Sequence, residues 1–214
     1  MALLPQPSVP PVPSLYIEAD GWCPQAQRRP SPNCDARADA TVVDLLVIHN
    51  ISLPPGQFGG PWIEDLFANR LDPDANPYFR QLQALRVSAH FLIRRDGSLL
   101  QFVPTLLRAW HAGVSTFGGR DRCNDFSIGI ELEGTDFTPF GSVQYVTLAA
   151  LTKALQARHP LVDVVGHEHV APGRKTDPGP LFSWETYQKL CLGKQESSVG
   201  AACATVPLRF LQAD

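Results

Sequence analysis

The stretch TVVDLLVIHN, residues 41–50, decides the fold of this sequence. Its β-branched and apolar side chains would occupy both faces of an extended strand, a pattern typical of a central strand covered on two sides. The pattern ends at His49 and Asn50, where a strand gives way to a loop. We therefore predict an internal strand that carries polar side chains at its end.

Two further strand patterns follow. Residues 86–94 and 98–103 flank Asp96-Gly97, a dipeptide that suits the positive-φ turn of a hairpin. Apolar and polar residues alternate through residues 126–133, which predicts a strand with one apolar face and one open face.

Helix patterns are interleaved with these strands. Residues 143–158 carry apolar side chains at helical spacing, 161–165 return as a short strand, and a last helix begins near Ser183. Together, these strand and helix patterns predict an α/β (α+β) single domain, in which helices pack against a central mixed β-sheet.

Composition limits the classes of function. The chain has 214 residues, 44% of them apolar and 18% charged, with a formal net charge of −3. A protein that binds duplex nucleic acid is usually basic, so we expect no nucleic-acid partner. No apolar run exceeds four residues, and the first 15 residues lack a basic start and a long apolar stretch. We therefore expect no membrane span and a cytoplasmic protein.

The two ends differ from the middle. Eight of the 20 prolines lie within the first 32 residues, which we expect to be extended, and the last 21 residues show no periodicity. We predict a Pro-rich arm over 1–15, a catalytic domain over 16–192 and a loosely held tail over 193–214. The five cysteines form no CxxC pair and indicate neither a disulfide framework nor a zinc ribbon.

Motifs of serine hydrolases, phosphate-binding loops and zincins are absent, so attention turns to histidines at strand ends. His49 ends one strand, and His167 and His169 follow another in the loop GHEHVAPGRKTDPG, residues 166–179. With Asp177, two imidazoles and a carboxylate would suffice for a catalytic metal site with one position open to water. Spacing alone leaves open which of His167 and His169 serves, and whether Asp177 is only a turn residue.

Two more residues suggest hydrolytic chemistry. Glu131 shares a strand face with Gly129, whose missing side chain leaves room for another group to approach. A carboxylate there can accept a proton from water and pass it to a leaving amine, although a solvated glutamate is the simpler interpretation. Lys175 precedes Asp177 by two residues and can stabilise an oxyanion, or be an ordinary exposed lysine.

Five segments together resemble the cytoplasmic AmpD-type N-acetylmuramoyl-L-alanine amidases, in the family's order. They are IHNISLPPGQFGG (48–60), SAHFLIRRDGSLLQFV (88–103), AWHAG (109–113), GRDRCNDFSIGIELEGTD (119–136) and GHEHVAPGRKTDPG (166–179). The resemblance implies the fold shared with phage amidases and peptidoglycan recognition proteins. It also implies hydrolysis of the amide between N-acetylmuramic acid, in its 1,6-anhydro form, and L-alanine of a small soluble muropeptide during cell-wall recycling.

The resemblance also implies roles for single residues. It makes His49, His167 and Asp177 the zinc ligands, which chooses His167 over His169. It makes Glu131 the proton acceptor and Lys175 the group that stabilises the transition state. It places four more residues near the substrate: Asn50, Trp110, His111 and Arg122. Two alternatives stay open, a peptidoglycan-binding module without catalysis and an exported amidase that lyses intact walls.

Overall fold

A seven-stranded mixed sheet organises the molecule, with strand order β1-β5-β4-β9-β3-β10-β11. The computed structural model describes residues 14–193 and 207–211. Neighbouring strands are parallel except for the antiparallel pair β4 and β5. The strands of this sheet are β1 (Gln27–Arg28), β3 (Leu45–Ile51), β4 (Phe91–Ile93), β5 (Leu99–Gln101), β9 (Ser127–Glu133), β10 (Asp163–Gly166) and β11 (Arg209–Phe210).

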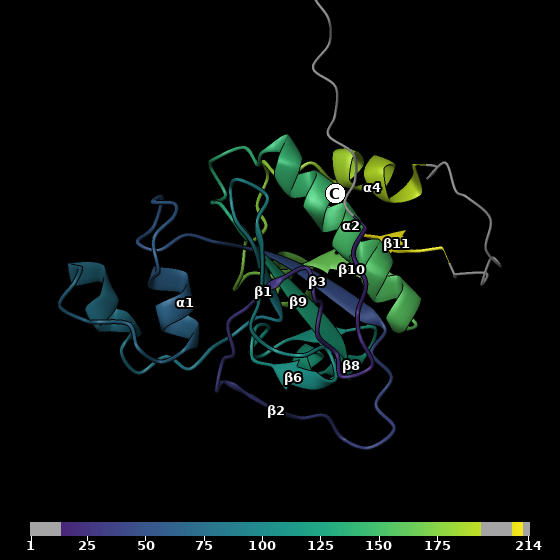
Figure 1. The fold of residues 1–214 in the computed structure, drawn as a ribbon, viewed down its shortest axis with the longest axis horizontal. Helices are drawn as coiled ribbons and strands as arrows, with labels where there is room; N and C mark the ends of the chain where they lie inside the picture. The colour runs from purple at the N-terminus through teal and green to yellow at the C-terminus, as the bar shows by residue number, and fades with distance from the viewer. Residues whose placement is uncertain (1–13, 194–206, 212–214) are drawn as a thin grey trace, which may run out of the picture.

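The remaining elements cover the sheet or lie at its edges. Two small antiparallel pairs join β2 to β6 and β7 to β8. These elements are β2 (Cys34–Ala36), α1 (Trp62–Phe67), η1 (Pro77–Leu82), β6 (Leu107–Ala109), β7 (Thr116–Phe117), β8 (Arg120–Asp121), η2 (Cys123–Asp125), α2 (Ser142–Arg158), α3 (His167–Val170) and α4 (Trp184–Leu192). Figure 1 shows α2 and α4 together on one side of the sheet, with α1 far from them on the other.

Alternation along the central strands separates two apolar layers. Leu46 and Ile48 of β3 point toward α2 and join the core that includes Leu148 and Leu151. Leu45 and Val47 point the opposite way and pack in a separate cluster under the 112–126 segment. The predicted internal strand, the mixed sheet and the flanking helices are thus confirmed.

The predicted hairpin forms with shorter strands. β4 and β5 pair antiparallel, and Gly97 between them has φ +82°, a conformation that costs glycine little. The predicted helix over 143–158 is α2, and Ser183 accepts a hydrogen bond from the Thr186 amide at the start of α4.

The open face predicted for residues 126–133 is wrong. Every residue of β9 is buried, because the His111 ring covers Gly129 and the Arg94 guanidinium pairs with Glu133 on the same face. The alternation of apolar and polar residues indicates which side chains share a face of the strand. Whether that face is buried depends on segments that are remote in sequence.

The predicted tail also changes in part. Residues 207–211 add β11 to the sheet, where the amides of Arg209 and Leu211 donate to carbonyls of Val162 and Val164. Phe210 packs edge-on against Tyr187 of α4. A two-residue strand has no periodicity to detect, so the sequence did not indicate it. The predicted arm falls mostly on residues 1–13, which lie outside the described residues.

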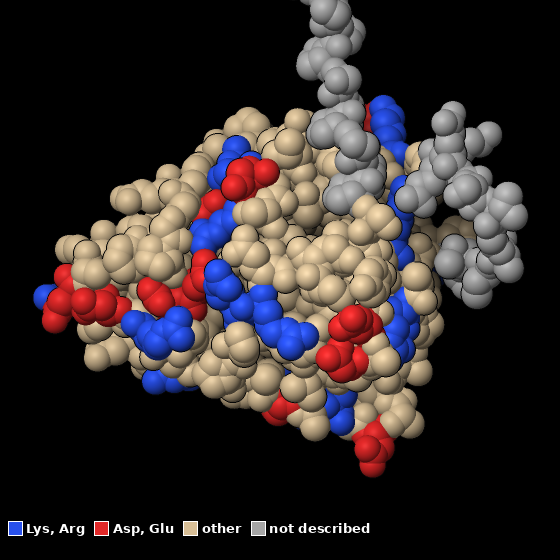
Figure 2. Space-filling model, in the orientation of Figure 1, with Lys and Arg blue, Asp and Glu red and all other residues tan. Residues whose placement is uncertain are grey.

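Charged side chains of both signs are interspersed on the face shown in Figure 2. Within the described residues, no helix is long and apolar enough to cross a membrane.

Candidate functional site

Three side chains from separate segments converge at the carboxyl ends of β3 and β10. The His49 Nδ1 atom lies 3.0 Å from His167 Nδ1 and 2.9 Å from an Asp177 carboxylate oxygen, and His167 Nδ1 lies 3.1 Å from the same oxygen. β10 pairs with β3 so that Gly166 is opposite Ile48, which brings His167 beside His49. Within the described part of the chain, this is the one group of three such side chains placed to hold a metal ion.

The two imidazoles are oriented by hydrogen bonds on their far sides. His167 Nε2 donates to the Ala112 carbonyl at 3.1 Å, since a carbonyl can only accept. This contact fixes a proton on Nε2 and turns Nδ1, the other ring nitrogen, toward Asp177. Burial and the neighbouring His167 lower the pKa of His49 to about 4, so the His49 ring is neutral at neutral pH.

This donor set fits a divalent metal ion. Two neutral imidazoles and one carboxylate match a catalytic zinc site that keeps a position open. Ligands of a tetrahedral zinc lie about 3.3–3.6 Å apart, given bonds of about 2.0–2.2 Å. The observed separations of 2.9–3.1 Å are only a few tenths of an ångström shorter. Converging lone pairs repel one another unless a cation lies between them.

Glu131 lies next to this cluster on the neighbouring strand. It is the register partner of His49 in the parallel pair of β3 and β9. Its Oε2 atom is buried and has no hydrogen-bond partner within residues 14–193 and 207–211. Burial, with a smaller effect of the Asp177 charge, raises the pKa of Glu131 well above its ordinary value, while Lys175 acts in the opposite direction.

A cavity of about 320 Å³ opens over these groups. Eight of the nine predicted site residues line it. They are His49, Asn50, Trp110, His111, Glu131, His167, Lys175 and Asp177. Asn50 lines it while its amide donates to Asp136 Oδ1 at 2.7 Å and to the Pro178 carbonyl, so it ties the Asp177 loop to the sheet.

Two predicted or considered residues lie outside the lining. Arg122 is exposed, and its guanidinium pairs with Asp125 at 3.3 Å. His169 is also outside, because α3 turns its ring away so that its Nδ1 accepts from the Gly166 amide. The loop expected at residues 167–169 is a short helix, which separates the directions of the two histidines.

An apolar wall completes the cavity and was missed by sequence reasoning. It comes from α1, η1 and the chain that follows, and includes Phe67, Tyr78, Leu82 and Leu85. The spacing of residues 78, 82 and 85 is a helical one, and this signal was available in the sequence.

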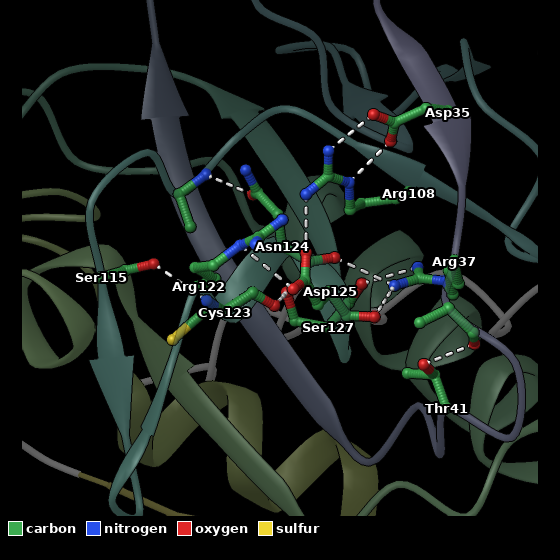
Figure 3. Close-up of polar contacts among 12 residues, drawn as sticks. Asp35, Arg37, Thr41, Arg108, Ser115, Arg122, Cys123, Asn124, Asp125 and Ser127 are labelled. Carbon is green, nitrogen blue, oxygen red and sulfur yellow. Dashed lines mark hydrogen bonds and ion pairs between the residues drawn. The ribbon is translucent and has the colours of Figure 1, made fainter.

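Figure 3 shows the polar contacts that surround η2. Arg108 bridges Asp35 and Asp125, and Arg37 donates to the carbonyls of Asn124, Asp125 and Ser127. These contacts anchor η2 next to β9, so the residues above it rest on a fixed element.

Comparison with known proteins agrees with this geometry. Residues 39–180 match the N-acetylmuramoyl-L-alanine amidase family. The chain belongs to that family. The three converging residues His49, His167 and Asp177, together with Glu131 and Lys175, lie inside the matched range.

Named relatives cover most of the amidase. It is 56% identical over 172 residues to the 1,6-anhydro-N-acetylmuramyl-L-alanine amidase AmpD of Escherichia coli (strain K12). This match covers 79% of this chain and 94% of the relative. It is 57% identical over 173 residues to the AmpD of Citrobacter freundii, at 80% and 92% coverage. The chain is thus a muropeptide amidase, as the resemblance implied.

Solved structures share its fold. A crystal structure of a selenomethionine AmpD derivative superposes with a TM-score of 0.79 at 56% identity, covering 81% of this chain and 98% of that one. A human peptidoglycan recognition protein, PGRP-Iβ C-terminal domain, superposes with a TM-score of 0.52 at 17% identity, covering 74% and 92%. The second likeness concerns the fold alone, and it confirms the predicted fold class.

Proposed function

We propose that this amidase is a cytoplasmic zinc enzyme of cell-wall recycling, formed by residues 16–192. Its proposed substrate is a small soluble muropeptide, cut at the amide between 1,6-anhydro-N-acetylmuramic acid and L-alanine. The observation that carries the proposal is the convergence of ligand atoms of His49, His167 and Asp177 within 3.1 Å of one another. Beside them lies Glu131, whose buried Oε2 atom has no hydrogen-bond partner among the described residues.

The substrate class is supported by the relatives. The AmpD proteins of Escherichia coli and Citrobacter freundii carry the 1,6-anhydro substrate in their names. A structure of Escherichia coli AmiD, 29% identical with a TM-score of 0.53 and covering 85% of this chain and 67% of that one, holds anhydro-N-acetylmuramic acid-L-Ala-D-gamma-Glu-L-Lys. The cavity here combines polar groups with the wall of Tyr78, Leu82 and Leu85.

Zinc would be held by His49, His167 and Asp177. When bound, it supplies Lewis acidity toward water and the scissile carbonyl, and it lowers the pKa of that water toward about 7. The same three atoms would be poorly placed without a cation, because their lone pairs point at one another.

Glu131 moves the proton. It takes a proton from the attacking water as the new bond forms between the water oxygen and the carbonyl carbon. It then gives this proton to the amide nitrogen of L-alanine as the C–N bond breaks, leaving a carboxylic acid on the lactyl group and a free amine. Burial suits this second role, because a raised pKa makes the carboxyl hold the proton until the leaving group takes it.

Lys175 supplies positive charge at the cavity mouth. It lines the cavity, and its charge acts on both Glu131 and His49. An ammonium there stabilises the negative oxygen of the tetrahedral intermediate. Asn50, Trp110 and His111 line the same cavity and are proposed to lie against the substrate, whereas a contact from Arg122 would require its side chain to leave Asp125.

The decisive experiment is product analysis with a purified anhydro-muropeptide in ¹⁸O-labelled water. We expect anhydro-N-acetylmuramic acid with one ¹⁸O in its lactyl carboxylate and an unlabelled peptide that begins with L-alanine. Chelator should stop the reaction and added zinc should restore it. Cleavage at another bond, or full turnover in chelator, would contradict the proposal.

Two further substrates, assayed under the same conditions, test the preference for the anhydro form and the alternative of a wall-lysing amidase. A muropeptide with a reducing end should be cut more slowly than its anhydro counterpart. Intact sacculi should release little product, whereas rapid release would favour a wall-lysing enzyme.

A further inference from the structure

The ring of His111 lines the cavity, yet both of its nitrogens are engaged inside the protein. Its Nδ1 atom lies 3.0 Å from His49 Nε2, on the side of that ring away from the ligand cluster. Its Nε2 atom lies 3.2 Å from Ser127 Oγ. His111 therefore stands between a proposed metal ligand and a buried hydroxyl of β9.

The direction of each hydrogen bond follows from one carbonyl. Ser127 Oγ lies 2.6 Å from the Cys123 carbonyl, which can only accept, so the hydroxyl proton is used there (Figure 3). Ser127 Oγ is left to accept, and His111 Nε2 must donate to it. A neutral His111 then has a bare Nδ1, which accepts from His49 Nε2. The Nδ1 lone pair of His49 is thereby directed at the ligand cluster.

The same loop orients the second histidine ligand. The carbonyl of Ala112, the residue after His111, accepts from His167 Nε2. Asn124 Oδ1 accepts from the backbone amides of both His111 and Ala112, at 3.1 Å and 2.8 Å. Asn124 belongs to η2, which Arg37 and Arg108 anchor (Figure 3).

The sheet is shaped to receive the His111 ring. A Cβ atom on Gly129 would lie 2.4 Å from His111 Cγ, closer than any side chain tolerates. The absence of a side chain in the middle of β9 is therefore what lets the ring lie over the strand.

We propose that His111 is a positioning residue for the metal site: with Ser127 it holds His49 as the tautomer whose Nδ1 is free to bind a metal ion. The inference rests on the proposed zinc site. Hydrogen-bond partners behind a ligand histidine typically change metal affinity about 10–100-fold when they are removed.

The test measures zinc affinity by chelator competition in folded, purified protein, before any activity assay. His111→Phe keeps a ring but removes the acceptor, and should weaken zinc binding about 10–100-fold. His111→Asn places a carbonyl oxygen near the former Nδ1 position, and should recover part of that loss. Equal affinities for His111→Phe and wild type would overturn the proposal, as would an Asn variant no better than Phe.

Two serines give a matched pair. Ser127 and Ser115 are both buried and both contact the backbone of Cys123, but only Ser127 reaches His111. Ser127→Ala should weaken zinc binding several-fold, and Ser115→Ala should leave it unchanged. Equal effects of the two changes would contradict the role given to Ser127.

The tautomers can be read directly by long-range ¹H–¹⁵N NMR of metal-free wild type labelled at histidine. His111 and His49 should both carry their proton on Nε2, and a His111 protonated on Nδ1 would overturn the proposal even if His111→Phe did not fold. A wild-type protein that binds no zinc would contradict the proposed function instead, since the tautomers are measured without metal.

Discussion

The two faces of β3 and β9 are made by alternate residues of the same strands, yet one face forms the apolar core and the other carries residues of the candidate site. Toward α2 the strands present Leu46, Ile48, Ile128 and Ile130, all fully buried in one apolar core. The other face carries His49 and Glu131 at the strand ends. One layer supplies stability by burying apolar area, and it holds the other layer rigid enough for chemistry. Substitutions on the two faces should therefore separate stability from activity.

The largest effect is expected from Asp177→Ala. Removing the carboxylate leaves two imidazoles, too few for a tight zinc site, so activity should fall to background and the purified protein should lack metal. The metal-free variant should unfold at a temperature close to that of metal-free wild type, because Asp177 is at the cavity and not in the apolar core. Full turnover in this variant would remove Asp177 from the metal site.

Glu131→Gln should come next. The amide cannot carry the proton between water and the leaving amine, so kcat should fall about 10²–10⁴-fold, while zinc content and KM change little. Metal analysis of the same sample is the internal control. An unchanged kcat would exclude Glu131 from the proton transfer.

Ile130→Ala tests the opposite face of the same strand. Ile130 lies between Gly129 and Glu131 in sequence but is fully buried against the α2 layer. The change should lower the free energy of unfolding by about 2–5 kcal/mol, and Ile130→Val by about 0.5–1.5 kcal/mol. At a temperature where the protein remains folded, kcat should stay within about twofold of wild type. A selective loss of kcat without loss of stability would show that the two faces are not separate.

Gly129→Ala should affect both properties, because the added methyl meets the His111 ring. We expect about 1–3 kcal/mol of destabilisation from overpacking, together with weaker zinc binding. Gly141→Ala is a suitable control, since a Cβ there meets nothing nearer than 3.6 Å. Denaturant unfolding measures the stability of both variants, and chelator competition measures their zinc affinity. Normal zinc affinity in Gly129→Ala would contradict the expectation that the added methyl displaces the His111 ring.

The smallest effect is a pH dependence in the metal-free protein. Burial raises the pKa of Glu131 above its ordinary 4.5, so the folded state keeps a proton that the unfolded chain has released. The folded state then binds more protons, and this group makes the free energy of unfolding fall as pH rises above about 4.5. Glu131→Gln should therefore gain stability relative to wild type as the pH rises above about 4.5. Urea unfolding in chelator measures it, and a difference independent of pH would contradict the pKa shift.

The sequence indicated the residues that line the site more fully than the segments that cover and support them. Strand-end polarity pointed to His49, and the motif around residues 166–179 contained both His167 and Asp177. The choice between His167 and His169 came from the resemblance, and α3 supplies its physical reason, since a helical turn directs the two rings differently. Glu131 was found from its place beside Gly129, although the strand was expected to be open on that side.

What the sequence determined by itself is local: an internal strand within 41–50, a turn at Asp96-Gly97, a helix over 143–158 and the chemical types of the residues that end the strands. Only the tertiary structure decided how those ends meet, that the His111 ring covers Gly129, that β11 extends the sheet, and that Arg122 stays outside the cavity. The physical reason is the distance along the sequence over which each kind of interaction acts. Periodicity and turn chemistry act over a few residues, whereas tautomers, burial and ligand convergence depend on contacts such as that of Ala112 with His167, 55 residues apart.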